Sequence, residues 1–233
     1  MALSDPRSFD LATTTKRDLN AAFHALAGDR SERHWRVDNP QGQHALAAGI
    51  DAPITVEIVG HAGYYCAGMN KQATVIVAGN AGVGVGENMM SGKVHVKGDA
   101  SQSAGATAHG GLLVIDGDAS ARCGISMKGV DIVVKGSIGP MSAFMGQSGN
   151  LVVLGDAGDA LGDSIYEARL FVRGTVKSLG ADCIEKKLRE EHRSELRRLL
   201  DAAGLPDVQP DEFNRYGSAR TLYNFHVDNA AAY

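Results

Sequence analysis

The chain has 233 residues, 44% of them hydrophobic, and its 29 glycines far outnumber its six Phe, six Tyr and one Trp. This composition fits one domain with a narrow core of small aliphatic side chains. The formal net charge of −4 gives no support for a nucleic-acid or anionic-membrane surface. No apolar run approaches the ~18 residues of a membrane span, and no secretory signal is recognisable. Three cysteines without a CxxC pair suit a reducing compartment, so we expect a cytoplasmic protein.

Residues 1–52 are expected to form an N-terminal α/β cap. Thr15 and Asp18 open a helix in the manner of a capping box, and Gly28 ends it. A cap is needed because the end of a β-solenoid exposes unpaired backbone and apolar core.

One pattern recurs seven times at a fixed period of 19 residues. Each unit has an aliphatic residue four positions before a glycine and another two positions before it, while the residue between them varies. This is the alternation of a short strand with one buried face, and a 19-residue unit buries that face only by stacking. The corner glycines are Gly60, Gly79, Gly98, Gly117, Gly136, Gly155 and Gly174.

The period predicts a parallel β-helix, because helical repeats need about 33 residues or more per unit. A left-handed hexapeptide helix is rejected, since its third face would include Gly68, Glu87 and Asp163, which cannot line a core. We therefore predict an all-β solenoid of about seven coils over residues 53–182, stacked at about 4.8 Å per coil. Val37 lies 19 residues before Val56, so a degenerate coil is expected there, with its inward pair interrupted at Asn39.

The densest glycine stretch does not fit a nucleotide site. Its spacing is GXGXG, Glu87 stands where a dinucleotide fingerprint needs glycine, and no helix follows to supply a positive end. Corners that need positive φ or close backbone approach are the better interpretation, and Gly98→Val or Gly117→Val is expected to cost solubility. The three glycines are Gly82, Gly84 and Gly86.

No catalytic, cofactor-binding or metal-binding residue is predicted in this chain. The histidines fall at different repeat positions without metal-ligand spacing, and acidic residues such as Asp99, Asp116 and Asp118 take outward or corner positions without converging. Cys66 and Cys123 share one repeat position three coils apart, about 14 Å, too far for a disulfide. They are interpreted as small buried hydrophobes.

Methionines collect at one corner, nine to eleven residues after their glycines. They fill the core or form an apolar ridge for a partner, and the sequence favours neither interpretation. They are Met69, Met89, Met90, Met127 and Met145.

Residues 183–233 are expected to form a helix and an extended tail. Ile184, Leu188 and Leu196 begin an apolar stripe that ends before Gly204, so the helix should cover the end of the rod or pack along its side. The tail is rich in aromatic residues, which anchor against a partner or pack on the chain's own rod. Deleting residues 213–233 is expected to weaken assembly and leave the rod folded. The candidate partner contacts are Phe213, Tyr216, Tyr223, Phe225 and Tyr233.

The segment from Gly82 to Val94 resembles the GXGXG domain that closes the large subunit of glutamate synthase. The same domain is known in the C subunit of formylmethanofuran dehydrogenase and in free-standing small subunits. The similarity covers about residues 50–183 and implies a right-handed β-helix. The tail from Tyr216 to Phe225 resembles the free-standing subunits of split glutamate-synthase-like enzymes, with the B subunit of N-methylglutamate synthase (methylamine–glutamate N-methyltransferase) as the best match.

The resemblance implies a division of labour within a hetero-oligomer. An N-terminal-nucleophile, amidotransferase-like subunit handles the amide or amine chemistry, and a synthase-like subunit carries FMN and an iron–sulfur cluster. The β-helix then serves as a non-catalytic scaffold, in line with the absence here of an N-terminal cysteine and of cluster-spaced cysteines. The implied reaction of the complex converts L-glutamate and methylamine to N-methyl-L-glutamate and ammonia.

Three other functions stay open at this point. One is the same role in an ordinary glutamate synthase. Another is a subunit of a formylmethanofuran dehydrogenase or formyltransferase/hydrolase complex. The third is a self-contained β-helix enzyme such as a polysaccharide lyase, which the lack of a secretion signal and of a carboxylate cluster disfavours.

Overall fold

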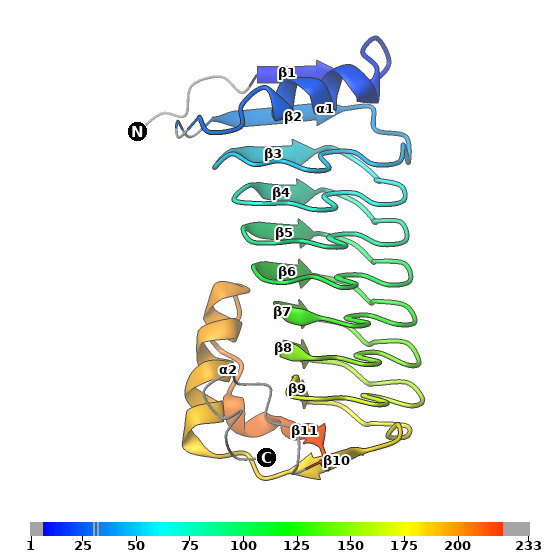
Figure 1. Ribbon diagram of the computed structural model, residues 1–233, viewed down its shortest axis with the longest axis vertical. Coiled ribbons are helices and arrows are strands. Elements are labelled where there is room, and N and C mark those ends of the chain that lie inside the picture. The colour runs from blue at the N-terminus through cyan, green and yellow to red at the C-terminus, as the bar shows by residue number, and fades with distance from the viewer. Residues whose placement is uncertain (1–6, 30, 32, 221–233) are drawn as a thin grey trace, which may run out of the picture.

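The computed structural model describes residues 7–29, 31 and 33–220, which form one stack of β-coils (Figure 1). Each repeat strand pairs in parallel with the next, with Val56 opposite Val75 and Ile58 opposite Val77. This register confirms the predicted seven-coil parallel β-solenoid. The strands are β3 (Thr55–Ile58), β4 (Thr74–Val77), β5 (Lys93–Val96), β6 (Leu112–Ile115), β7 (Lys128–Val134), β8 (Ser148–Val153) and β9 (Arg169–Val172).

A second parallel ladder runs along the stack, two residues after each corner glycine. Most of its members are alanines, and the core beside it is filled by aliphatic side chains such as Val85 and Leu113. The ladder consists of Ala62, Ala81, Ala100, Ala119, Ile138, Ala157 and Val176.

The remaining side of each coil has left-handed backbone at every second residue. In one coil, Gly84 and Gly86 have φ of 71° and 65°. Their N–H groups bind opposite neighbours in the stack. Gly84 donates to the carbonyl of Gln102 in the following coil, and Gly86 donates to that of Cys66 in the preceding coil, each at 2.9 Å. Glycine adopts this backbone without the Cβ penalty of other residues, which explains two of the three glycines in GXGXG.

The other glycines are required by close approach of neighbouring coils. A Cβ on Gly82 would lie 2.6 Å from the carbonyl carbon of Gly63, and one on Gly98 would lie 2.0 Å from Oδ1 of Asn80. Among the seven corner glycines, φ is positive at Gly60 alone. The expectation of positive φ or close approach is therefore confirmed for both kinds of glycine.

The sheet continues into the N-terminal segment through β2 (His34–Asp38) and β1 (Arg7–Asp10), both parallel to β3. Trp35 lies opposite Val56 and Val37 opposite Ile58, so the first interval is 21 residues and the predicted pairing of Val37 with Val56 is wrong by two. The longer coil lets Trp35 occupy the inward position, where it packs against aromatic rings of the cap.

Helix α1 (Lys16–His24) covers the first coil and begins at the predicted cap. Its polar side chains bind carbonyl groups that have no preceding coil to pair with. Asn20 donates to the carbonyl of Ala45 at 2.7 Å, and Nε2 of His24 lies 2.8 Å from that of Ala48. Side chains of the cap therefore supply hydrogen-bond partners to backbone carbonyl groups at the open end of the solenoid.

The C-terminal segment differs from the sequence expectation. Ile184 lies in strand β10 (Cys183–Lys186), and the helix α2 begins only at Glu190 and ends at Ala202. After a 3₁₀ turn at Pro210–Glu212, strand β11 (Asn214–Ser218) runs antiparallel between β9 and β10. This long-range pairing supplies backbone partners to β10 and overrides its local helical pattern.

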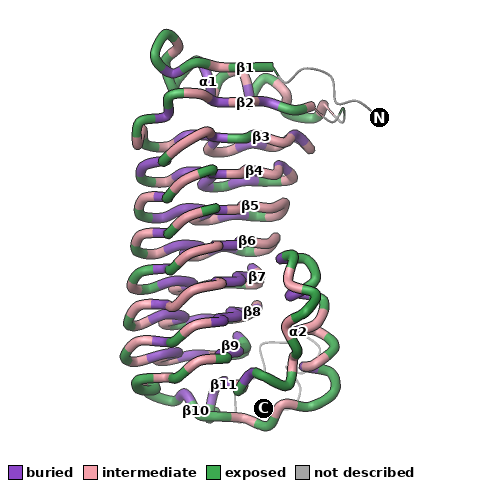
Figure 2. The backbone as a smooth tube through the Cα atoms, turned by 180° about the vertical axis from the view of Figure 1, so that it is seen from behind, coloured by how far each residue is buried: buried purple, intermediate pink, exposed green. Residues whose placement is uncertain are grey.

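Helix α2 packs along the side of the rod, one of the two predicted placements (Figure 1, Figure 2). A second apolar cluster joins its leucines to outward-facing residues of β6–β9 and to Phe213. The main core, by contrast, is continuous from Leu11 to Tyr216 and crosses both predicted segment boundaries. The sheet residues beneath the helix are Val114, Val133, Val152 and Phe171.

Candidate functional site

Polar side chains directly after the corner glycines form a hydrogen-bonded column. Each accepts the backbone N–H of the residue 19 positions later, at 2.7–3.0 Å. The N–H and hydroxyl of Thr175 thereby lower the pKa of Asp156. The aspartates of this column are solvent-facing, as predicted. Their structural role was missed, although its signal is the recurring Asn, Asp or Ser after glycine. The acceptors are His61, Asn80, Asp99, Asp118, Ser137 and Asp156.

One titratable pair lies on strand β5 and directly after strand β6, with its side chains 14% and 24% exposed. Nε2 of His95 is 2.9 Å from Oδ1 of Asp116, which also binds Nζ of Lys135 at 2.8 Å. Burial lowers the pKa of His95 and outweighs the opposing effect of Asp116. Burial also opposes ionisation of Asp116, but hydrogen bonds from Lys135 and His95 outweigh it and keep the pKa of Asp116 low. At neutral pH the pair is a neutral imidazole beside a carboxylate neutralised by lysine.

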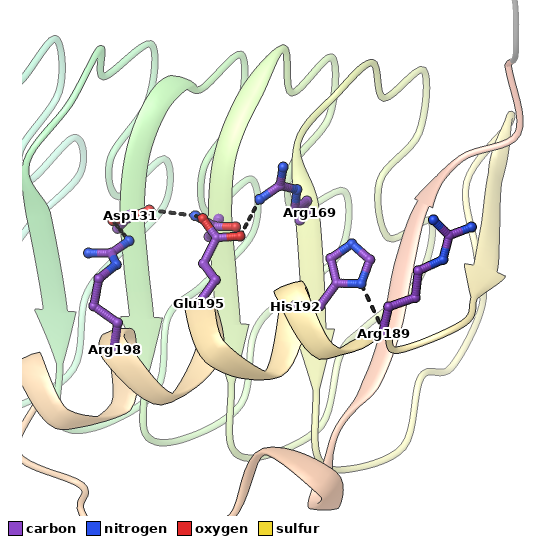
Figure 3. A network of polar contacts seen from close by, with 7 residues as sticks. Asp131, Arg169, Arg189, His192, Glu195 and Arg198 are labelled. Atoms are coloured by element: carbon purple, nitrogen blue, oxygen red, sulfur yellow. Dashed lines mark hydrogen bonds and ion pairs between the residues drawn. The ribbon is translucent and has the colours of Figure 1, made fainter.

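A polar network fastens α2 to the sheet (Figure 3). Asn150 is 5% exposed and its Nδ2 donates to Asp131 at 2.7 Å and to Glu195 at 3.2 Å. Arg198 binds the other oxygen of Asp131 at 3.0 Å, and Arg169 forms an ion pair with Glu195. The network pairs each carboxylate with a guanidinium and the buried amide, so it orients the helix on the strands beneath it.

The first turn of α2 contains a buried histidine (Figure 3). Nδ1 of His192 accepts the backbone N–H of Arg189 at 3.1 Å. Burial and the nearby Arg215 guanidinium lower the pKa of His192. The neutral ring therefore closes the start of the helix, a role that sequence reasoning missed.

The methionine corner is divided between core and surface. Met89 and Met127 are fully buried, whereas Met69, Met90 and Met145 are 51%, 47% and 42% exposed. The division follows the repeat, because the tenth residue after each glycine points inward and its neighbours point outward. The core interpretation is therefore confirmed for Met89 and Met127, whereas the partner-covered ridge stays a prediction for the three exposed methionines.

The cysteines are buried and unpaired, as predicted. Burial raises the pKa of the Cys66 and Cys123 thiols to about 12 and that of Cys183 to about 11. Thiols this far from ionisation are poor nucleophiles and poor metal ligands.

The candidate partner contacts fall into two groups. Phe213 belongs to the apolar cluster beneath α2, and Tyr216 belongs to the main core. Both are buried by this chain itself, which leaves little of either side chain for a partner. Tyr223, Phe225 and Tyr233 lie outside the described residues.

Over the described ranges, no three His, Cys, Asp or Glu side chains are grouped so that they could hold a metal ion. Within the same ranges, neither helix has the length and apolar character that crossing a membrane requires.

The sequence has a full-length curated relative. Protein GlxC from Rhizobium meliloti (strain 1021) is 66% identical over 224 residues, which cover 96% of this chain and 98% of the relative. No family model matches the chain.

Proposed function

The chain belongs to the GlxC family, and we propose that it is a non-catalytic scaffold subunit of a split glutamate-synthase-like complex. The proposal is supported by the resemblance of its central coils to the GXGXG domain and of its tail to free-standing small subunits. The observation that carries it is that polar side chains of the repeat serve in hydrogen bonds within the rod. The aspartates and asparagine of the corner column accept backbone N–H groups of the next coil, so they hold the rod together.

Within that class, we propose that the complex is N-methylglutamate synthase. An amidotransferase-like subunit and a synthase-like subunit with FMN and an iron–sulfur cluster would then carry out the chemistry. The β-solenoid would hold the two together through surfaces that its own helix leaves open. The resemblance of the tail to the free-standing subunits supports this choice over a formylmethanofuran dehydrogenase complex, and an ordinary glutamate synthase is the alternative that the experiment below must separate.

Co-expression with the two proposed partner types tests the assignment. The three chains are expected to co-elute from gel filtration as a complex with flavin and iron–sulfur absorbance, and to form N-methylglutamate from glutamate and methylamine. Leaving out this chain should separate the other two. Full assembly and turnover without it would contradict a scaffold role. Formation of glutamate from glutamine, 2-oxoglutarate and a supplied reductant, with no N-methylglutamate formed, would move the complex to the ordinary glutamate synthases.

A further inference from the structure

A hollow of about 180 Å³ lies where strands β10 and β11 close the C-terminal end of the sheet. Its lining includes Lys186, Arg215 and Arg220, together with Ser218 and Glu167. Lys186 and Arg215 face each other directly in the register of the two strands. Like charges in this position repel, which destabilises a sheet unless something neutralises them.

The neighbouring cations of this region have carboxylate partners. Arg220 binds Asp182 at 2.5 Å, and Arg169 forms an ion pair with Glu195. Within the described part of the chain, neither Lys186 nor Arg215 has a carboxylate oxygen at ion-pair distance, although Glu167 lines the same hollow. Neither cation is therefore held in a direct ion pair among these residues, although the Glu191 and Glu195 carboxylates lie close enough to act on the charge of Arg215.

The guanidinium of Arg215 also has unused hydrogen-bond donors. Its one hydrogen bond to a described residue runs from Nη1 to the carbonyl of Lys187 at 3.5 Å. Its Nε is buried and binds no acceptor among those residues, an arrangement that is costly for a folded protein. Burial and the nearby guanidinium groups of Arg169 and Arg189 lower the pKa of Arg215, yet an arginine stays charged at neutral pH.

Gly217 keeps space open between the two cations. A Cβ at this position would lie 3.6 Å from Cδ of Lys186 and 3.9 Å from Nη2 of Arg215. Its φ is not positive, unlike that of the corner residues, so the backbone does not require glycine here. A side chain at Gly217 would fit the strand and extend into the hollow.

We propose that this hollow binds a carboxylate group, which Arg215 and Lys186 hold together. The planar fork of a guanidinium matches the two oxygens of a carboxylate, and the lysine adds a second charge-assisted hydrogen bond. The carboxylate belongs to a small free acid or to an acidic side chain of another protein. This inference is independent of the proposed function, because it concerns the chain alone.

The test follows the Nε–Hε signal of Arg215 by NMR in the isolated, ¹⁵N-labelled protein at low salt. One titration uses succinate, and another uses a tetrapeptide with two glutamates beside a matched peptide with two glutamines. A saturable shift is expected with succinate or with the acidic peptide, and none with the glutamine peptide. Lys186→Gln should weaken binding about tenfold, the effect of losing one charge-assisted hydrogen bond.

Gly217→Val provides the steric variant, because it should fold normally and abolish the shift. Lys177→Gln is the control, since Lys177 is already paired with Asp159 elsewhere on the rod and its loss should leave binding unchanged. Binding of succinate identifies a free acid as the ligand type, and binding of the acidic peptide alone identifies a protein side chain. No shift with either probe, or equal binding by the Gly217→Val variant, would overturn the proposal.

Discussion

The corner glycines show how a single residue type is selected by packing between coils. In mid-stack, Gly117 donates its N–H to the carbonyl of Gly98 at 3.0 Å, while the Asp99 side chain passes beside it to reach the next backbone N–H. The space that a Cβ would need is therefore taken by the hydrogen-bonded column. The requirement comes from the neighbouring coil, and the period of the sequence reveals it although no single unit does.

Gly117→Ala tests this contact with the smallest possible change. The added Cβ would lie 2.1 Å from Oδ1 of Asp99 and 3.0 Å from backbone atoms of Gly98. We expect the free energy of unfolding to fall by about 2–4 kcal/mol, through overpacking and a displaced hydrogen bond. Urea denaturation measures this change.

The matched control is Gly217→Ala, whose Cβ meets no atom nearer than 3.6 Å. It should change stability by less than about 1 kcal/mol. Equal stability of the two variants would show that neighbouring coils do not require glycine at the corner.

At the scale of elements, the strands of the rod are encoded by a local repeat, whereas the placement of helix α2 is encoded by long-range contacts. The strands recur at a fixed spacing, so once one strand is assigned correctly the positions of the others follow from the period. Helix α2 depends on contacts with residues far away in the chain, and Ile184 shows how such contacts override a local pattern. The apolar run at the outward strand position, such as Val133 and Val152, is a signal for that helix which the sequence interpretation did not use. The network around Asn150 has no local signal, because its members meet only after the helix docks.

Leu199→Ala is expected to loosen α2 without unfolding the rod. Leu199 is fully buried against the sheet, and deleting a buried leucine side chain costs about 2–5 kcal/mol. Amide exchange in residues 190–202 should therefore accelerate, while the strands stay protected. Leu113→Ala, at an equally buried site inside the rod, should lower protection of the strands as well. Equal effects of the two changes would show that helix and rod unfold as one unit.

The docking of α2 should also depend on pH through His192. Its pKa is lowered from 6.5 in the folded state, so the unfolded chain binds the proton first as pH falls. The stabilisation is complete above the unfolded pKa and decreases as pH drops below 6.5 toward the folded value. We expect the free energy of unfolding to fall between pH 7 and pH 5, and His192→Gln to reduce the slope. The remaining slope should reflect His95, whose pKa is lowered too. A protein that becomes more stable over this range would contradict the assignment.

At the scale of the whole molecule, the C-terminal segment belongs partly to the rod. Strand β11 lies between β9 and β10, and Phe213 and Tyr216 are buried. The sequence-based expectation that residues 213–233 can be removed without loss of the fold therefore does not follow from the structure. Truncation after Glu212 should lower the melting temperature strongly compared with truncation after Arg220, because it removes β11 and two buried aromatic side chains. Circular dichroism melting compares the two, and a stable protein that ends at Glu212 would refute the role of β11.

We proposed above that this chain assembles the complex and supplies no catalytic group. The most direct measurement is turnover of methylamine and glutamate by a reconstituted complex that contains the His95→Gln, Asp116→Asn double variant. These two residues form the hydrogen-bonded titratable pair beside strands β5 and β6. For a scaffold subunit we expect normal co-elution and a rate within about twofold of the wild type, because the side chains of a scaffold take no part in the reaction. A complex that assembles fully and retains flavin, yet loses turnover, would contradict it and place catalytic residues on this chain.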